Sequence, residues 1–168
     1  MRPEDAKVIA GFLLNSLEWE IKITAAVLAA APADALAYKP DSKSKSAVEL
    51  LRHITLEDEW LLDSVARGSF GPMPDESDAS GIMTPGDAVA RYNERIPAVL
   101  ARVRALSGEE LARPMDFFGN MMPAVNVLSV ALCHSVHHRG QLSTYLRPMG
   151  GKVPSIYGPT ADTPIAAA

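Results

Sequence analysis

The chain has 168 residues, the size of one ordinary domain with a single hydrophobic core. Its residues are 48% hydrophobic and 21% charged, which is typical of soluble globular proteins. The net charge of −4 and the scattered Lys and Arg residues argue against nucleic acid as a partner, because phosphate binding needs clustered positive charge. One cysteine, Cys133, excludes an internal disulfide, and no apolar run is long enough to span a bilayer. We therefore expect a cytoplasmic protein without a membrane partner.

The first predicted helix covers about residues 3–31. Pro3 suits the first helical turn, where its missing N–H costs nothing, and Pro32 ends the helix. Apolar residues recur mostly at spacings of three or four, so we expect them to face the core. They are Val8, Ile9, Phe12, Leu13, Leu17, Ile21, Val27 and Leu28.

The second predicted helix begins at Ser46, with Glu49 three residues later forming a capping box. It ends near Gly68, a residue that readily adopts the left-handed conformation of a C-cap. Residues 69–83 are rich in Gly, Pro, Ser and Asp, which predicts a long crossover loop. Such a length lets the next helix cross the bundle rather than pack beside its predecessor.

The third predicted helix begins after Thr84, an N-cap residue followed by Pro85 at the first helical position. It extends to about residue 106, and Pro97 predicts a kink or a break near Ile96. Residues 116–122 are irregular in pattern, which is consistent with either a hairpin or a loose loop.

The fourth predicted helix runs from near Pro123 to about Leu146. In the tail from about residue 152, we expect apolar anchors to pack the first part back on the bundle, and residues 166–168 to fray. The pattern therefore predicts one all-α domain over residues 1–168. It is a four-helix bundle with a long crossover connection between the second and third helices and an irregular C-terminal tail. The tail anchors are Val153, Ile156, Tyr157 and Ile165.

Three of the four histidines lie in one run of five residues in the fourth predicted helix. His134 and His138 are four residues apart, so a helix places both on one face, where two imidazoles can bind one metal ion. Ser135 stands where the H-E-x-x-H metalloproteases carry Glu, so their chemistry is absent. His137 lies about a hundred degrees around the helix from His138, and we expect it to face elsewhere, with its role open.

His53 in the second helix shares a face with Leu50 and Glu57, so it points toward the interior. A third ligand from another helix gives a facial set with open positions, the pattern of a catalytic rather than a structural site. The alternative is that these histidines are hydrogen-bonded core residues, since H-x-x-x-H pairs also arise by chance. Cys133 is expected to be a small buried apolar residue rather than a nucleophile.

Two segments resemble the DinB/YfiT-like family: the run from His134 to Asp162, and the entry to the second helix from Tyr38 to His53. The run HHRGQL at 137–142 followed by VPSIYG at 153–158 is the most specific signature. The resemblance covers most of the chain. It implies a bundle of mixed connectivity, often a homodimer, with nickel or zinc on one His of the second helix and an H-x-x-x-H pair of the fourth. Those positions match His53, His134 and His138.

Characterised members that the chain resembles include metal-dependent S-transferases that use bacillithiol or mycothiol. The resemblance therefore implies a metal-dependent enzyme, transferase-like or hydrolase-like, acting on a small molecule with a low-molecular-weight thiol as a second cofactor. Glu57, Gln141 and Tyr145 are candidates for proton handling or substrate positioning, and hydrogen bonds within the bundle are their alternative role. Two other functions stay open: a non-catalytic metal-binding stress-response protein, and a dimeric interaction module whose histidines are incidental.

Overall fold

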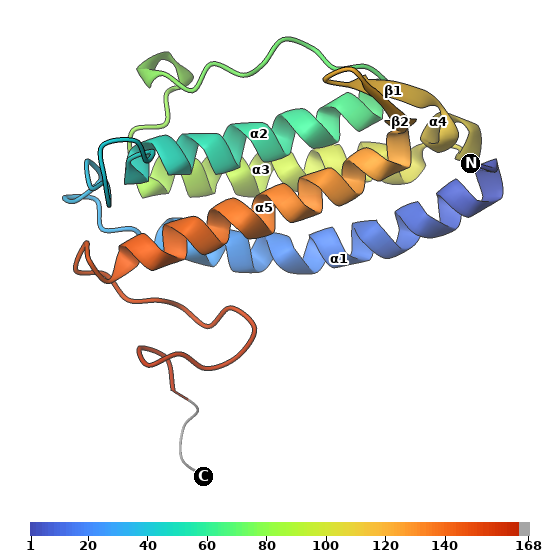
Figure 1. The fold of residues 1–168 in the computed structure, drawn as a ribbon. Coiled ribbons are helices and arrows are strands. Elements are labelled where there is room, and N and C mark those ends of the chain that lie inside the picture. Colours follow the sequence, from blue (N-terminus) through green and yellow to red (C-terminus); the bar gives the residue numbers. More distant parts are fainter. Residues whose placement is uncertain (165–168) are drawn as a thin grey trace.

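The computed structural model describes residues 1–164 and consists mainly of a bundle of four long helices (Figure 1). These are α1 (Pro3–Ala29), α2 (Ala47–Arg67), α3 (Pro85–Ala105) and α5 (Ala124–Leu146). A 3-10 turn, η1 (Asp78–Ser80), interrupts the loop before α3. Between α3 and α5 lie the short helix α4 (Gly108–Ala112) and a hairpin of β1 (Pro114–Phe117) and β2 (Asn120–Pro123). The predicted all-α bundle is confirmed. No helix within residues 1–164 has the length and apolar character needed to cross a membrane.

The order of the helices around the bundle is α1, α3, α2, α5, so that each packs against two neighbours. The crossover loop runs back along the bundle, and α3 therefore runs in the same direction as α2 (Figure 1). The long crossover is confirmed, but the expectation that α3 would not pack beside α2 is wrong. The loop returns to the beginning of α2, so α3 runs parallel to α2 and still packs beside it. As a result α2 lies antiparallel beside α5, and these two helices carry all four histidines.

Helix ends follow the sequence signals closely. The Ser46 hydroxyl accepts from the backbone N–H of Glu49, and the Glu49 carboxylate accepts from the backbone N–H of Ser46 at 2.6 Å. Thr84 and Asp87 repeat this reciprocal arrangement at the start of α3. Gly68 ends α2 at φ 81°, a left-handed conformation that costs glycine little. Local side chains thus satisfy backbone groups that the helices leave unpaired.

The buried face of α1 agrees only in part with the predicted one: Leu13, Leu17, Val27 and Leu28 are buried as predicted, but the apolar residues near the start of the helix are not. Val8 and Phe12 are 74% and 72% exposed, and Ile9 is exposed as well. Apolar residues occur on more than one side of this helix, and periodicity does not say which side meets the core. Small side chains permit close helix contact, which favours the face with two alanines. The residues buried in this first part of α1 are Ala6, Ala10, Leu13, Leu14 and Leu17.

Helix α3 continues through Pro97 to Ala105, so the break that was one of two alternatives predicted near Ile96 is absent. Pro97 removes the backbone N–H that would bond to the carbonyl of Asn93. Both residues lie on the exposed face of the helix, where water can donate to the freed carbonyl. The proline therefore leaves no buried carbonyl without a hydrogen-bond partner.

The stretch predicted as a hairpin or a loose loop is a hairpin. Asp116 pairs with Met121, and the chain turns at Phe118 and Gly119, whose φ angles of 50° and 85° are both positive. Two positive φ angles are the requirement of a type I′ turn, which matches the twist of the strands. Helix α4 just before it was not predicted, although Ser107 and Glu110 form a third capping box there.

The tail after α5 lies against the bundle. Val153 and Ile156 pack on the core. The Asp162 carboxylate accepts hydrogen bonds from the Arg147 side chain at 2.9 Å and from the backbone N–H of Val153 at 3.0 Å. The predicted anchor Ile165 and the fraying of residues 166–168 lie outside the described residues.

The capping box of α2 predicts a pH dependence of stability. Hydrogen bonds from the Ser46 backbone N–H and hydroxyl hold the pKa of Glu49 at about 2, below its usual 4.5. A carboxyl with a lowered folded-state pKa stabilises the fold above its unfolded pKa, and that stabilisation is lost as the pH falls through the folded value. The side chain is 44% exposed, so solvent screens the effect.

We expect Glu49→Gln to lower the free energy of unfolding by roughly 0.5–1 kcal/mol at pH 7. The difference from the wild type should shrink as the pH falls from 4.5 towards about 2. Urea denaturation at several pH values measures both. Glu94→Gln, on the exposed face of α3, is the matched control and should show no such trend. A difference that stays constant with pH would contradict the assignment.

Candidate metal centre

Three imidazoles from two helices meet at one point between α2 and α5. The Nε2 atom of His53 lies 3.1 Å from Nε2 of His138 and 3.2 Å from Nε2 of His134. His134 and His138 lie on successive turns of α5, and His53 faces them from α2. The three residues form a group whose ligand atoms could hold one metal ion.

The other ring nitrogen of each histidine faces an oxygen. Nδ1 of His53 lies 2.6 Å from the Glu76 carboxylate, and Nδ1 of His134 lies 2.9 Å from the Asp58 carboxylate. An ionised carboxylate only accepts hydrogen bonds, so both Nδ1 atoms must carry the proton. With the Nδ1 proton in place, the neutral form of each ring presents an unprotonated Nε2 toward the centre.

The third histidine is oriented by a side-chain amide. Nδ1 of His138 lies 3.1 Å from Oε1 of Gln141. The Tyr145 hydroxyl donates to the carbonyl of Lys45 at 3.2 Å, so it must accept from the Gln141 amide group at 3.3 Å. This fixes the amide with its oxygen toward His138, which therefore donates through Nδ1 as the other two rings do.

These assignments leave three lone pairs pointing at one another. Burial of the ring is the main cause that lowers the pKa of His138 to about 4, and it also lowers the pKa of His53. Neither ring is therefore positively charged at neutral pH. Converging lone pairs repel unless a cation lies between them. A tetrahedral ion with nitrogen ligands at about 2.0–2.1 Å holds those nitrogens about 3.3–3.4 Å apart, close to the separations found here.

Glu57 lies one turn after His53 and is 6% exposed. One of its carboxylate oxygens is close to ligand atoms of His53 and Glu76, and the three form a second possible metal-binding group. Among residues 1–164 no hydrogen bond reaches this carboxylate, and burial raises its pKa. Glu57 is thus a buried acid beside His53 and Glu76 whose carboxylate has no hydrogen-bond partner among the described residues.

Two carboxylates of the site were missed by sequence reasoning. Asp58 is on α2 next to Glu57, and the sequence alone gives no sign that its buried carboxylate faces His134. Glu76 comes from the crossover loop, where it also bonds to Lys45 at 2.7 Å. Nothing in its local sequence distinguishes it from other loop acids, because only the path of the loop brings it to His53.

The other residues singled out on α5 lie on its outer side. Cys133 is exposed, so the expectation that it is buried is wrong. His137 is exposed and is not one of the three converging rings, and its ring packs edge-on against His138 with the centroids 4.6 Å apart. A groove of about 460 Å³ runs along this side of the helix and is lined by Ser129, Val130, Cys133, His134, His137 and His138. The predicted ligands His134 and His138 therefore border open space.

Comparison with known proteins places this arrangement in a family. The model of the DinB family matches residues 6–164. An uncharacterised Bacillus subtilis protein, YjoA, is 31% identical over 121 residues, covering 70% of this chain and 75% of YjoA. A second uncharacterised protein of that organism, YrdA, is 38% identical over 52 residues, 31% of each chain.

Two solved structures have the same fold. A DinB-like protein from Bacillus cereus superposes with a TM-score of 0.72 at 21% identity, covering 86% of this chain and 95% of that one. The DinB-like protein YjoA from Bacillus subtilis gives a TM-score of 0.67 at 23% identity, covering 86% and 96%. With the family model matched from α1 to the end of the described tail, this chain belongs to the DinB family.

Proposed function

We propose that the protein binds one divalent metal ion through Nε2 of His53, His134 and His138, and that it is an enzyme acting on a small molecule. One observation carries the proposal: each ring is fixed by a hydrogen bond at Nδ1, so three unprotonated nitrogens converge. Such outer hydrogen bonds are the usual support of metal-bound histidines. Family membership adds weight to the site and does not name a reaction.

Nickel and zinc are the ions that suit these ligands, since both bind imidazole well. Three neutral ligands leave the full charge of the ion and at least one open position, as in catalytic zinc sites. An ion bound there would lower the pKa of a coordinated water or thiol, which is the chemistry of an S-transferase or a hydrolase. We infer an S-transferase-like reaction with a low-molecular-weight thiol in the cytoplasm, where such thiols stay reduced.

The chain's own residues have distinct roles in this proposal. Glu57, which is buried and has no hydrogen-bond partner among residues 1–164, orients the substrate by accepting its proton or hydrogen bond. Gln141 and Tyr145 act on His138 instead, because their hydrogen bonds link Nδ1 of that ring to the carbonyl of Lys45. They are positioning residues, and Glu57 is the one expected to touch the substrate.

A second copy of the chain is the partner that we propose for the exposed side of α1 and α5. Phe12 and Trp19 of α1 are 72% and 55% exposed. With Leu132 and Val136 of α5 they line an apolar groove of about 590 Å³. Exposed apolar patches of this kind mark protein interfaces, and the family resemblance implies a homodimer.

Metal binding is tested by elemental analysis of protein purified without a His-tag. We expect about one equivalent of nickel or zinc per chain. His134→Ala removes one of three ligands and should lower the metal content several-fold. His137→Ala removes an exposed histidine of the same helix that is not one of the three converging ligands, and this variant should keep the metal. Equal loss in both variants, or no metal in the wild type, would refute the site.

Catalysis is tested by a screen of bacillithiol, mycothiol and related thiols against electrophiles, following the loss of free thiol. Glu57→Gln should lower turnover by about 100-fold with the metal content unchanged. Glu94→Gln is the exposed control. Full activity after metal removal would contradict the enzyme proposal. A sharp fall in melting temperature on metal removal, with no turnover of any thiol or ester, would favour the non-catalytic alternative, in which the ion tethers α2 to α5.

The dimer is tested by light scattering after size exclusion. Phe12→Lys places a charge in the proposed interface and should convert a dimer to a monomer. Phe118→Lys is the matched control, because Phe118 is 71% exposed at the tip of the hairpin. A wild-type chain that is monomeric at high concentration would contradict the interface.

A further inference from the structure

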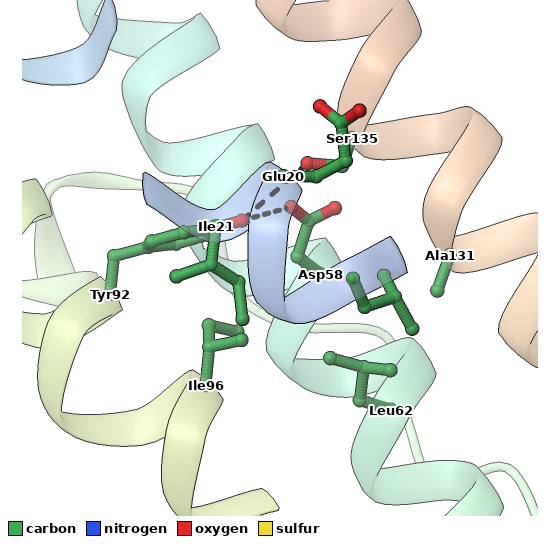
Figure 2. Close-up of a pocket in the computed structure, with 9 residues that line it drawn as sticks. Glu20, Ile21, Asp58, Leu62, Tyr92, Ile96, Ala131 and Ser135 are labelled. Carbon is green, nitrogen blue, oxygen red and sulfur yellow. Dashed lines mark hydrogen bonds between the residues drawn. The ribbon is translucent and has the colours of Figure 1, made fainter. Parts of the chain in front are cut away.

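A chain of buried polar side chains runs through the bundle from Arg139 on α5 to His134, and the residues between them come from α1, α2, α3 and α5. Figure 2 shows the hydroxyl of Tyr92 hydrogen-bonded to both Asp58 and Ser135, at 2.9 and 3.5 Å. Ser135 is 3.2 Å from the hydroxyl of Thr24 on α1, and that hydroxyl is 3.3 Å from the Arg139 guanidinium. All five side chains lie in the interior.

The residues at the two ends of this hydrogen-bonded series, Arg139 and Asp58, fix the direction of every hydrogen bond in it. Arg139 can only donate, and the Asp58 carboxylate can only accept. Tyr92 donates its one proton to Asp58, so it accepts from Ser135, and Ser135 in turn accepts from Thr24. Burial raises the pKa of Tyr92 well above its usual range, so the phenol keeps this proton at neutral pH.

Asp58 is the point where this chain meets the histidine cluster. It is 2% exposed; Oδ2 accepts from Tyr92, and Oδ1 faces Nδ1 of His134. The cavity beside it is about 10 Å³ and is lined in part by Glu20, Asp58, Tyr92 and Ser135. That volume is at the lower limit for a single water molecule, so solvent is a poor substitute for the Tyr92 hydroxyl.

Arg139, the outer end of this hydrogen-bonded series, is held by an ion pair with Glu20 and by Tyr157 of the C-terminal tail. Arg139, 1% exposed, pairs with the Glu20 carboxylate of α1. It also donates to the Tyr157 hydroxyl at 2.5 Å, and Tyr157 donates to Glu20 at 2.9 Å. Arg139 and Tyr157 belong to the two signature runs of the sequence, and the metal ligands alone give them no role.

We propose that Tyr92 is a positioning residue for the metal centre: through the donor chain from Arg139 it fixes Asp58, which holds His134 with Nε2 toward the ion. The proposal rests on the metal site proposed above and extends it by one layer of residues. Loss of the Tyr92 hydroxyl frees Asp58 to rotate. His134 then loses its fixed tautomer and orientation, which a metal-binding imidazole needs.

The test compares Tyr92→Phe with Thr55→Val. Thr55 is on α2, 1% exposed, and its hydroxyl has no hydrogen-bond partner within the described chain, so its replacement removes a buried hydroxyl that holds nothing. The dissociation constant for Ni²⁺ is measured by competition with a chelator. We expect it to rise about 10-fold in Tyr92→Phe and to stay unchanged in Thr55→Val. Ser135→Ala, which removes the donor to Tyr92, should give a smaller rise in the same direction.

A measurement on the metal-free protein makes the test independent of how much metal each variant binds. Nitrogen NMR of the imidazoles should find His134 protonated at Nδ1 in the wild type and in Thr55→Val. In Tyr92→Phe a substantial fraction protonated at Nε2 is expected.

Unchanged Ni²⁺ affinity and an unchanged tautomer in a folded Tyr92→Phe protein would overturn the inference while leaving the metal site intact. An equal loss of affinity in Thr55→Val would also overturn it, because the effect would then be a general one of buried hydroxyls. A wild-type chain that binds neither nickel nor zinc would overturn the proposed function and this inference together.

Discussion

The feature on which the rest of the structure depends is the hydrogen bond at Nδ1 of each clustered histidine. Three imidazoles could meet between two helices in many orientations, including ones in which they bond to each other. Here Glu76, Asp58 and Gln141 each accept from one ring, so the rings cannot satisfy one another and their free nitrogens converge. A cluster of this kind is unfavourable without a cation, and the bundle holds it in place nonetheless.

The topology of the bundle supplies those three acceptors from different directions. Because the crossover loop returns along the bundle, it carries Glu76 to His53 and lets α3 lie parallel to α2, with Tyr92 behind Asp58. Because α2 runs antiparallel beside α5, the beginning of α2 meets the second half of α5. Gln141 needs only its own helix, being one turn beyond His138, and Tyr145 fixes its amide. Every long helix except α1 therefore contributes directly to the rings or to the residues that orient them, and α1 contributes Thr24 and Glu20 to the outer chain.

Sequence patterns predicted what is local and missed what depends on packing. The Ser46 capping box and Gly68 located the two ends of α2, and Thr84 with Pro85 located the start of α3. The four-residue spacing placed His134 and His138 on one face. The choice of His53 as third residue came mainly from the family resemblance. Glu76 and Asp58 were not predicted, because the local sequence around an acid in a loop or a helix does not indicate which ring it will contact. The exposed side of α1 was misassigned for the same reason: Val8 and Phe12 fit a helical period, but the period does not reveal which face meets the other helices.

The central claim, that three Nε2 atoms hold one ion, is tested most directly by anomalous X-ray diffraction at the nickel and zinc edges from crystals of untagged protein. The account predicts one strong peak between α2 and α5, about 2.0–2.1 Å from Nε2 of His53, His134 and His138. The account would be contradicted if no peak lay near those three nitrogens, or if the ion were bound through Nδ1 atoms with the carboxylates displaced.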